Sequence, residues 1–372
     1  MGGMVGHGDG RERTEPLRYN FEYERRVRAG FIGCGGHAFR NVYPALRHAP
    51  VDLVAVCDFD LERAKVYARE FGASHAYASH TAMLAQEQLD AVFIVTNYDE
   101  QSRPRYPDLA CDAMRAGAHA WIEKPPAASV SEIERMQRVE GQTGKFVQVG
   151  FKKMFFPAIA KVKAITQQPE FGQLSSVYAR YPQALPGPAL RTDRRAMLGF
   201  LDHLFHPASI IHLIAGEVAA LHYTWEPRSK ASITTLRFRQ GGIGTLQLVS
   251  GQSGTSPLER LEVVGTGANV VVDNGIKLTY YRPGRRGPGG YGRQPNYIGP
   301  DEGAPLVWEP EFSLGQLYNN GLFLLGYVPE VLAFCESVLT NTPPGKAGLN
   351  DALALLRWYE AYTQPEGQWI TL

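Results

Sequence analysis

A glycine-rich turn joins the first apolar run of this chain to a helix-like segment. Residues 28–32 form the run, and Gly33-Cys34-Gly35-Gly36-His37-Ala38 follows it at once, before an amphipathic segment at 38–47. Glycine at 33 permits a tight turn from strand to helix, and glycine at 35 lets the backbone approach an anion at the amino end of that helix. The six turn residues therefore predict a βαβ unit that binds the pyrophosphate of a dinucleotide.

Apolar and amphipathic segments alternate over the first 150 residues. The pattern predicts strands at 28–32, 51–57, 91–95, 119–122 and 146–150, with helices at 38–47, 61–71, 107–116 and 130–139 between them. Strands that alternate with helices form βαβ units around a parallel sheet. We therefore expect a doubly wound α/β domain, a Rossmann fold, at residues 27–150, after a flexible N-terminal extension at residues 1–26.

The pattern changes after Gly150. One helix at 158–165 precedes consecutive strands, interrupted by a helix at 201–214; the predicted strands are 174–181, 219–225, 232–238, 244–250, 261–264, 269–272 and 277–281. Gln240-Gly241-Gly242 between two alternating runs is typical of a hairpin. Residues 283–305 should form a long loop, and helices at 326–339 and 349–362 end the chain. Residues 151–372 thus predict a second, α+β domain with a large, mostly antiparallel sheet.

The composition argues against several kinds of partner. The net charge is +1, from 38 Lys and Arg against 37 Asp and Glu, so neither nucleic acid nor an anionic membrane is expected as a partner. No apolar run of membrane-spanning length and no signal-peptide layout is visible. The four cysteines are scattered without metal-ligand spacing, which favours a reduced, cytoplasmic protein.

An acidic residue at the end of the second predicted strand completes the dinucleotide motif. Asp58 lies about 20 residues beyond the turn, where a carboxylate can bind both ribose hydroxyls. This carboxylate would repel a 2′-phosphate, and neither residue 59 nor residue 60 is arginine, so NAD is predicted rather than NADP. The alternative is a flavodoxin-like sheet with a chance glycine turn and a surface aspartate.

The tripeptide Glu123-Lys124-Pro125 ends the predicted strand 119–122. Ligands of open α/β sheets bind beyond the carboxyl ends of the strands, so Lys124 should face the same crevice as the glycine turn. A cation there can hydrogen-bond a substrate oxygen and stabilise a developing alkoxide, and Glu123 could orient its ammonium. The alternative is a solvated lysine that merely ends a strand.

Asp202 and His206 are spaced i, i+4, which places both side chains on one face of the predicted helix 201–214. Histidine suits proton exchange with an alcohol or ketone, and a neighbouring carboxylate can orient it or bind an adjacent hydroxyl. Two alternatives are an exposed polar face and a metal site formed with His203. No further ligand is evident nearby, so no metal is predicted.

In this order, the glycine turn, Asp58, Glu123-Lys124-Pro125 and Asp202 with His206 resemble the Gfo/Idh/MocA (glucose–fructose oxidoreductase / inositol dehydrogenase / MocA) family. The resemblance implies hydride transfer between NAD and a secondary alcohol or ketone of a sugar, cyclitol or sugar derivative. It implies Lys124 and His206 as the catalytic pair, with His206 as general base and Asp202 on the substrate hydroxyl. It also implies an open sheet that joins subunits into a homodimer or homotetramer.

Several further residues are expected to line the site. Thr96 and Asn97, which follow the strand 91–95, are expected to contact the cofactor together with Glu123 and Lys124. Arg191, in the charged loop 182–195, and Lys152 are expected to contact a polar or anionic group of the substrate; a solvated charge run is the alternative for that loop. Tyr106 replaces a histidine common in the family, and residues 97–105 form a longer loop than expected, so the pocket should be unusual there.

Two other functions fit the same residues. Some proteins of this family keep NAD bound and recycle it within one catalytic cycle, so that transient oxidation of a sugar permits elimination or glycosidic cleavage. A catalytically silent NAD-binding sensor or regulator is the other alternative. The presence of Lys124, Asp202 and His206 argues against a silent protein.

Overall fold

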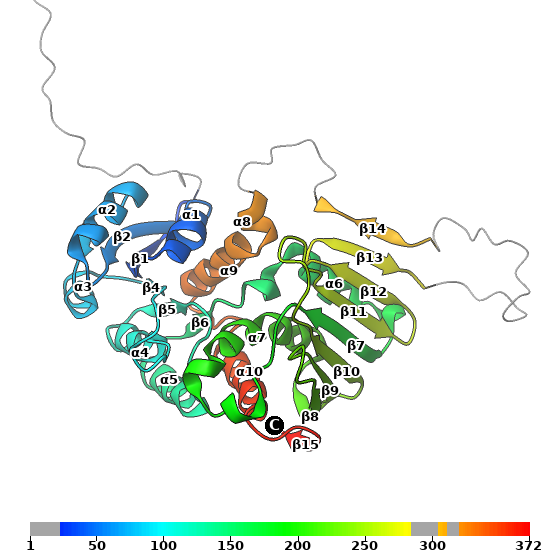
Figure 1. The fold of residues 1–372 in the computed structure, drawn as a ribbon. Helices are drawn as coiled ribbons and strands as arrows, with labels where there is room; N and C mark the ends of the chain where they lie inside the picture. Colours follow the sequence, from blue (N-terminus) through cyan, green and yellow to red (C-terminus); the bar gives the residue numbers. More distant parts are fainter. Residues whose placement is uncertain (1–22, 284–303, 311–319) are drawn as a thin grey trace, which may run out of the picture.

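The chain forms two β-sheets, with helices packed around and between them (Figure 1). The computed structural model describes residues 23–283, 304–310 and 320–372. Most of the predicted extension 1–26 and of the predicted loop 283–305 lies outside these residues.

The first sheet has six parallel strands in the spatial order β3-β2-β1-β4-β5-β6. They are β1 Val27–Ile32, β2 Val51–Cys57, β3 His75–Tyr77, β4 Ala91–Ile94, β5 His119–Ile122 and β6 Val147–Val149. The strand order reverses between β1 and β4, as in a Rossmann fold, and this confirms the predicted doubly wound sheet. Ligands of such folds bind at this reversal, beyond the carboxyl ends of the strands, and the glycine turn after β1 lies there.

Helices connect the strands, and all but one of them lie at positions that the sequence predicts. They are the π-helical turn η1 Ala38–Val42, α1 Tyr43–Leu46, α2 Leu61–Phe71, α3 His80–Gln86, α4 Tyr106–Arg115 and α5 Val130–Thr143. The bounds of α2 are those predicted, because the Asp60 side chain caps its first turn and left-handed Gly72 ends it. Strand β3 and helix α3 were not predicted; β3 has three residues, none of them buried, and gives no apolar run.

The second sheet has nine strands in the order β14-β13-β12-β11-β7-β10-β9-β8-β15, antiparallel except for the pair β7 and β10. The strands are β7 Leu174–Tyr181, β8 Val218–Trp225, β9 Ser232–Phe238, β10 Ile243–Leu248, β11 Arg260–Gly265, β12 Asn269–Asp273, β13 Lys277–Tyr281, β14 Leu306–Trp308 and β15 Trp369–Thr371. The mostly antiparallel sheet and the β9–β10 hairpin are confirmed. The two edge strands, β14 and β15, were missed because each has only three residues.

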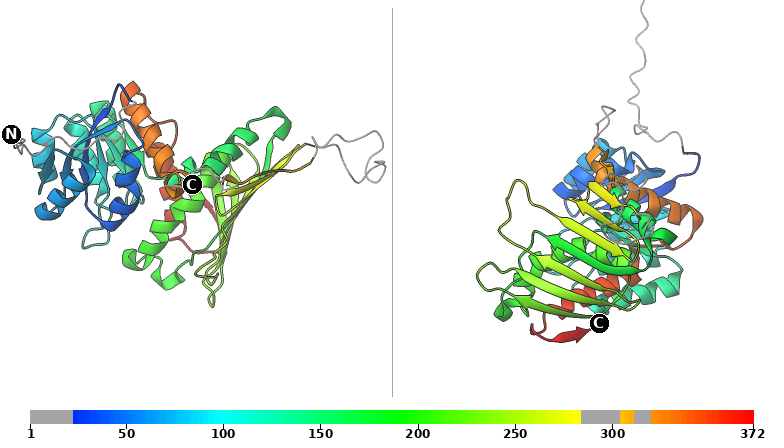
Figure 2. Two further views of the ribbon diagram at one scale, coloured as in Figure 1. Left: turned by 90° about the horizontal axis from the view of Figure 1, so that it is seen from above. Right: turned by 90° about the vertical axis from the view of Figure 1, so that its right-hand side faces the viewer.

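Helices cover only one face of the second sheet (Figure 2, left). Helices α6 Pro157–Thr166 and α7 Arg194–Ala215 pack against β12 and β7, respectively. Helix α7 begins at Arg194 rather than at the predicted residue 201, because the Asp193 side chain accepts a hydrogen bond from the backbone N–H of Ala196 at 3.0 Å. The charged loop before α7 is therefore shorter than predicted, and Arg194 and Arg195 belong to the helix.

By length and composition, α7 is the one helix among the described residues that could cross a membrane. However, 56% of its most apolar stretch is buried inside the protein, where Leu201, Leu204 and Ile211 join the core. Such burial is typical of the central helix of a packed domain, so the helix is weak evidence for a membrane span.

The C-terminal helices connect the two sheets. Helix α9 Tyr327–Thr340, which follows α8 Asn320–Leu324, packs against β1 and α1 of the first sheet. Helix α10 Leu349–Ala361 contacts both α5 and α7. One continuous apolar core extends from Ile94 in the first sheet to Leu246 in the second. This packing fixes the position of α7 relative to the strand ends of the first sheet.

Candidate active site between the two sheets

The glycine turn after β1 has the open backbone that a pyrophosphate requires. Gly33 has φ +110°, and a Cβ atom there would lie 1.9 Å from the carbonyl oxygen of Val95, so only glycine fits. A Cβ atom at Gly35 or Gly36 would meet nothing within 4 Å in the described structure. The helical segment that begins at Ala38 presents its free N–H groups here, where an anion is favoured.

Asp58, at the end of β2, anchors this turn. Its Oδ2 accepts a hydrogen bond from the Cys34 N–H at 2.8 Å, and its Oδ1 accepts one from the Asp60 N–H at 3.0 Å. An ionised carboxylate has about four acceptor positions, so both oxygens can still receive a ribose hydroxyl. Arg63, in the first turn of α2, lies 4.0 Å from Asp58 and pairs with Asp60 at 3.2 Å. Residues 59 and 60 alone therefore do not describe the charge beside Asp58, because the helical turn that starts at Asp60 brings Arg63 there.

Thr96 and Asn97 lie two and three residues after the end of β4, beside the glycine turn. The Thr96 hydroxyl is buried and has no hydrogen-bond partner in the described structure, while its carbonyl accepts a hydrogen bond from the Tyr106 hydroxyl at 3.0 Å. Asn97 is exposed. A buried hydroxyl without a partner costs free energy that a ligand can offset. Together with the open glycine backbone, this hydroxyl fits a bound dinucleotide.

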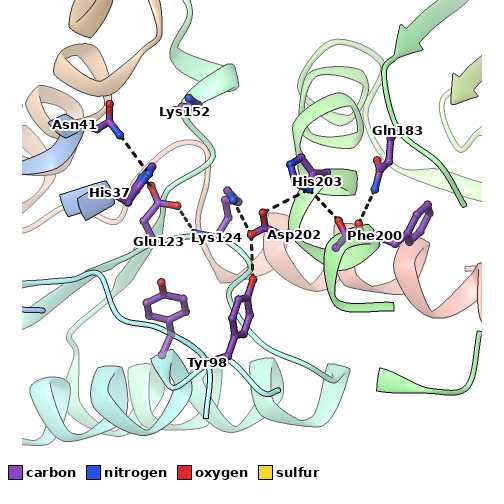
Figure 3. Close-up of polar contacts among 12 residues, drawn as sticks. His37, Asn41, Tyr98, Glu123, Lys124, Lys152, Gln183, Phe200, Asp202 and His203 are labelled. Carbon is purple, nitrogen blue, oxygen red and sulfur yellow. Dashed lines mark hydrogen bonds and ion pairs between the residues drawn. The ribbon is translucent and has the colours of Figure 1, made fainter. Parts of the chain in front are cut away.

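Glu123 does not bind the Lys124 ammonium, which corrects the expectation from the sequence. Its Oε2 accepts a hydrogen bond from the backbone N–H of Lys124 at 2.8 Å, and its Oε1 lies 2.9 Å from His37 Nε2 (Figure 3). His37 is in turn held by Asn41 at 3.2 Å. Both carboxylate oxygens of Glu123 thus have other partners, and the Lys124 ammonium donates to Asp202 instead. Glu123 therefore ties the end of β5 to the glycine turn.

Lys124, which lies just after β5, and Asp202, on helix α7, form an ion pair although they are far apart in the chain. Lys124 Nζ donates to Asp202 Oδ1 at 2.8 Å, and the Tyr98 hydroxyl donates to the same oxygen at 3.0 Å (Figure 3). The side chains of Lys124 and Asp202 are 15% and 28% exposed. This partial exposure leaves both groups accessible to a small polar ligand.

His206 lies one turn after Asp202 on α7 and is half-buried. Its burial and the positive charges of Lys153, Lys124 and Lys152 hold the pKa of His206 well below its usual value. The imidazole is therefore neutral at neutral pH and can accept a proton. Within the described residues, no hydrogen bond occupies its ring nitrogens, and its ring centroid lies 6.1 Å from that of Tyr181.

Two neighbouring lysines contribute this positive charge. Lys152, in the turn η2 Lys152–Phe155, donates to the Tyr327 hydroxyl at 2.9 Å, and burial lowers its pKa. Lys153 is buried, forms an ion pair with Glu259 and lies 4.6 Å from the centroid of the Tyr181 ring. Sequence reasoning missed Lys153, although a lysine within a strongly apolar run is a signal for a buried, paired charge.

Arg191 is not available to a substrate, which corrects another expectation. Its side chain is 2% exposed and forms an ion pair with Glu366. Arg191 Nη1 also donates to the Tyr223 hydroxyl at 3.0 Å, and Nε donates to the Pro186 carbonyl at 3.0 Å. Its guanidinium lies 5.3 Å from the Trp225 ring centroid. These contacts connect the loop before α7 to β8 and to the C-terminal segment, which is a scaffold role.

A metal ligand set is not evident in the described parts of the chain, where no three His, Cys, Asp or Glu side chains gather in a suitable cluster. His203 is exposed, and its Nδ1 lies 2.9 Å from the Gly199 carbonyl oxygen and 3.5 Å from Asp202 Oδ2. The candidate site thus contains a cation, a carboxylate and a neutral imidazole beside a dinucleotide turn, which is an arrangement suited to proton and hydride exchange at an alcohol.

Comparison with known proteins supports this interpretation. Residues 27–151 match the sequence profile of the oxidoreductase family with an NAD-binding Rossmann fold, GFO_IDH_MocA. This part of the chain, the Rossmann domain, thus belongs to the Gfo/Idh/MocA family.

Two relatives and one solved structure illustrate the similarity. Inositol 2-dehydrogenase of Salmonella typhimurium is 25% identical over 216 residues, which cover 57% of this chain and 61% of that enzyme. D-xylose 1-dehydrogenase (NADP(+)) 2 of Haloferax volcanii is 29% identical over 161 residues, 42% of this chain and 46% of that enzyme. The chain thus matches less than two thirds of the length of either relative. A dehydrogenase structure from Chromobacterium violaceum shares the fold of this chain, with TM-score 0.73, 21% identity and coverage of 91% of this chain and 94% of that one.

Proposed function

We propose that this Gfo/Idh/MocA protein is an NAD-dependent dehydrogenase that acts on a secondary alcohol, or the corresponding ketone, of a sugar, cyclitol or sugar derivative. One observation carries the proposal. Lys124, Asp202 and His206 gather beyond the carboxyl ends of the strands that also hold the glycine turn. The two relatives described above act, by their names, on a cyclitol and on a sugar, which supports the substrate class.

The residues around the crevice fit a nicotinamide dinucleotide. The turn Gly33 to Ala38 would bind the pyrophosphate, Asp58 the ribose, and Thr96 and Asn97 the part nearest the nicotinamide, which supplies the hydride acceptor when bound. The Asp58 carboxylate favours NAD because it repels a 2′-phosphate. Arg63 would offset part of this repulsion, so we propose a preference for NAD with weaker use of NADP.

Three side chains would divide the chemistry at the substrate. His206 is neutral and can accept the hydroxyl proton as general base. Lys124 can donate a hydrogen bond to the reacting oxygen and stabilise alkoxide character. Asp202 can accept a hydrogen bond from a substrate hydroxyl and so align the sugar. Lys152, beside this group, is the further candidate for a substrate contact.

The uncovered face of the second sheet supports a homodimer or homotetramer. Apolar side chains on this face are exposed, among them Ile233 at 50% and Ile243 at 59%. An exposed apolar patch of this kind is typical of an interface between proteins. The four cysteines are free thiols, which supports a cytoplasmic location.

A single-turnover experiment tests the proposed reaction. Protein loaded with NAD is mixed with a panel of sugars, cyclitols and glycosides, and the absorbance of reduced nicotinamide is followed. We expect a stoichiometric rise with one class of compound. A product formed without net NADH would instead indicate the cofactor-recycling alternative, and tight NAD binding with no reaction on any compound would favour the silent sensor.

A further inference from the structure

The segment 97–105, between β4 and α4, is the loop that is longer than expected, and it has a defined internal structure. Asp99 Oδ1 accepts hydrogen bonds from the backbone N–H groups of Gln101 at 2.9 Å and Arg103 at 2.8 Å. Asp99 Oδ2 accepts another from Arg103 Nε at 2.8 Å. Tyr98 and Pro104 form an isolated β-bridge across the base of the loop. These contacts hold the backbone of Tyr98 in one position.

The Tyr98 side chain extends from this loop to α7. Its hydroxyl donates to Asp202 Oδ1, the oxygen that also accepts the hydrogen bond from Lys124 (Figure 3). Burial, together with the charges of Asp202 and Glu123, raises the pKa of Tyr98, so the phenol remains a neutral donor. Asp202 Oδ2 has only His203 Nδ1 near it, at 3.5 Å, among the described side chains.

Two donors on one oxygen restrict the rotation of a carboxylate. The last side-chain torsion of aspartate has a broad energy well, and a lysine on a long, flexible stem restrains it weakly. A tyrosine has fewer rotatable bonds and here stands on a fixed loop. The Tyr98 hydroxyl therefore selects which carboxylate oxygen of Asp202 is left for a substrate hydroxyl.

We propose that Tyr98 is a positioning residue that fixes the Asp202 carboxylate, so that Oδ2 receives one substrate hydroxyl while Lys124 serves the reacting oxygen. This inference rests on the proposed dehydrogenase function. Tyr98 would thus act on the reaction through Asp202, and the loop 97–105 would help to align the substrate.

Tyr98→Phe removes only the hydroxyl, and Tyr77→Phe is its matched control. The Tyr77 hydroxyl also donates to a carboxylate, that of Glu87 at 2.5 Å, but it lies on β3, at the edge of the sheet away from Lys124 and Asp202. With the best substrate of the panel, we expect Tyr98→Phe to lower kcat/KM roughly tenfold, the loss expected for one hydrogen bond to a charged group. NADH affinity, measured by fluorescence titration, should stay unchanged, and Tyr77→Phe should match the wild type in both measurements.

A double-mutant cycle separates positioning from a general structural effect. If Tyr98 acts through Asp202, then Tyr98→Phe should have almost no further effect on kcat/KM in the Asp202→Asn background. Additive losses would overturn the proposal, because they would show that Tyr98 acts independently of the carboxylate.

A measurement without substrate keeps the inference distinct from the proposed function. In protein labelled with isotopic aspartate, the carboxyl resonance of Asp202, assigned with Asp202→Asn, should shift in Tyr98→Phe and not in Tyr77→Phe. If no compound supports turnover, the dehydrogenase proposal fails while this resonance still reports on the contact. An unchanged resonance would overturn the role of Tyr98 whatever the activity.

Discussion

The ion pair of Lys124 with Asp202 and the ion pair of Arg191 with Glu366 combine similar charges in different surroundings. In the crevice, both side chains are partly exposed, and Asp202 also accepts a hydrogen bond from Tyr98. Beside β8, Arg191 is 2% exposed and is enclosed by Tyr223, Trp225 and Glu366. A cation that solvent reaches can exchange its partner for a ligand, whereas the buried Arg191 guanidinium is committed to the fold, although Glu366 itself is 32% exposed. The exposure of the cation therefore distinguishes the candidate site from the scaffold more clearly than residue type does.

The largest effect in this comparison is expected from Lys124→Ala. Loss of a donor to the developing alkoxide should lower kcat by roughly 10²–10³-fold. NAD affinity should stay near that of the wild type, and stability should change by only about 0–1 kcal/mol because the pair is partly exposed. Single-turnover kinetics, NADH fluorescence and urea unfolding measure these three quantities. Wild-type turnover in this variant would show that Lys124 is not a catalytic residue.

Glu366→Ala should show the opposite behaviour. It leaves the buried Arg191 guanidinium without its counter-charge, so we expect a loss of about 3 kcal/mol in the free energy of unfolding. At a temperature where the variant stays folded, kcat/KM should change little. Urea denaturation together with steady-state kinetics gives both values. A variant with normal stability and a raised KM would instead show that Arg191 contributes to substrate binding.

Asp58→Ala should change the choice of cofactor. It removes the ribose acceptor and the repulsion of a 2′-phosphate, so the ratio of NAD to NADP affinity should fall about tenfold. The same titration on Arg63→Ala sharpens the result, since loss of this cation should weaken NADP and leave NAD nearly unchanged. An Asp58→Ala variant with an unaltered preference for NAD over NADP would show that the carboxylate only stabilises the glycine turn and does not bind the ribose.

The smallest effect is expected from pH near neutrality. The folded pKa of His206 is depressed, so its neutral, basic form persists as the pH falls through the range near 6.5 where an ordinary histidine gains a proton. The kcat/KM for alcohol oxidation should therefore stay nearly constant from about pH 8 to about pH 6 and decline only in more acidic solution. A pH–rate profile measures this. A midpoint near 6.5 would show that the surroundings of His206 do not lower its pKa in the working enzyme.

The sequence itself determined five of the six strands of the first sheet and seven of the nine strands of the second, because apolar periodicity and glycine turns are local signals. It also determined which residue types line the strand ends and that Asp202 and His206 share a helix face. The strands that it missed, β3, β14 and β15, are three residues long, and their pairing depends on neighbours in the sheet.

Only the tertiary structure decided the partners of the charged groups. Tyr98 and Asp202 are 104 residues apart in the chain, and Arg191 and Glu366 are 175 apart. No local pattern reports such distances, so the sequence could not show that Arg191 is buried, that Glu123 binds His37, or that Tyr98 shares an oxygen with Lys124. The local sequence thus set the chemistry available at the crevice. The packing of α7 against the Rossmann sheet set which of those groups meet there, because burial and hydrogen bonding depend on residues that are far apart in the chain.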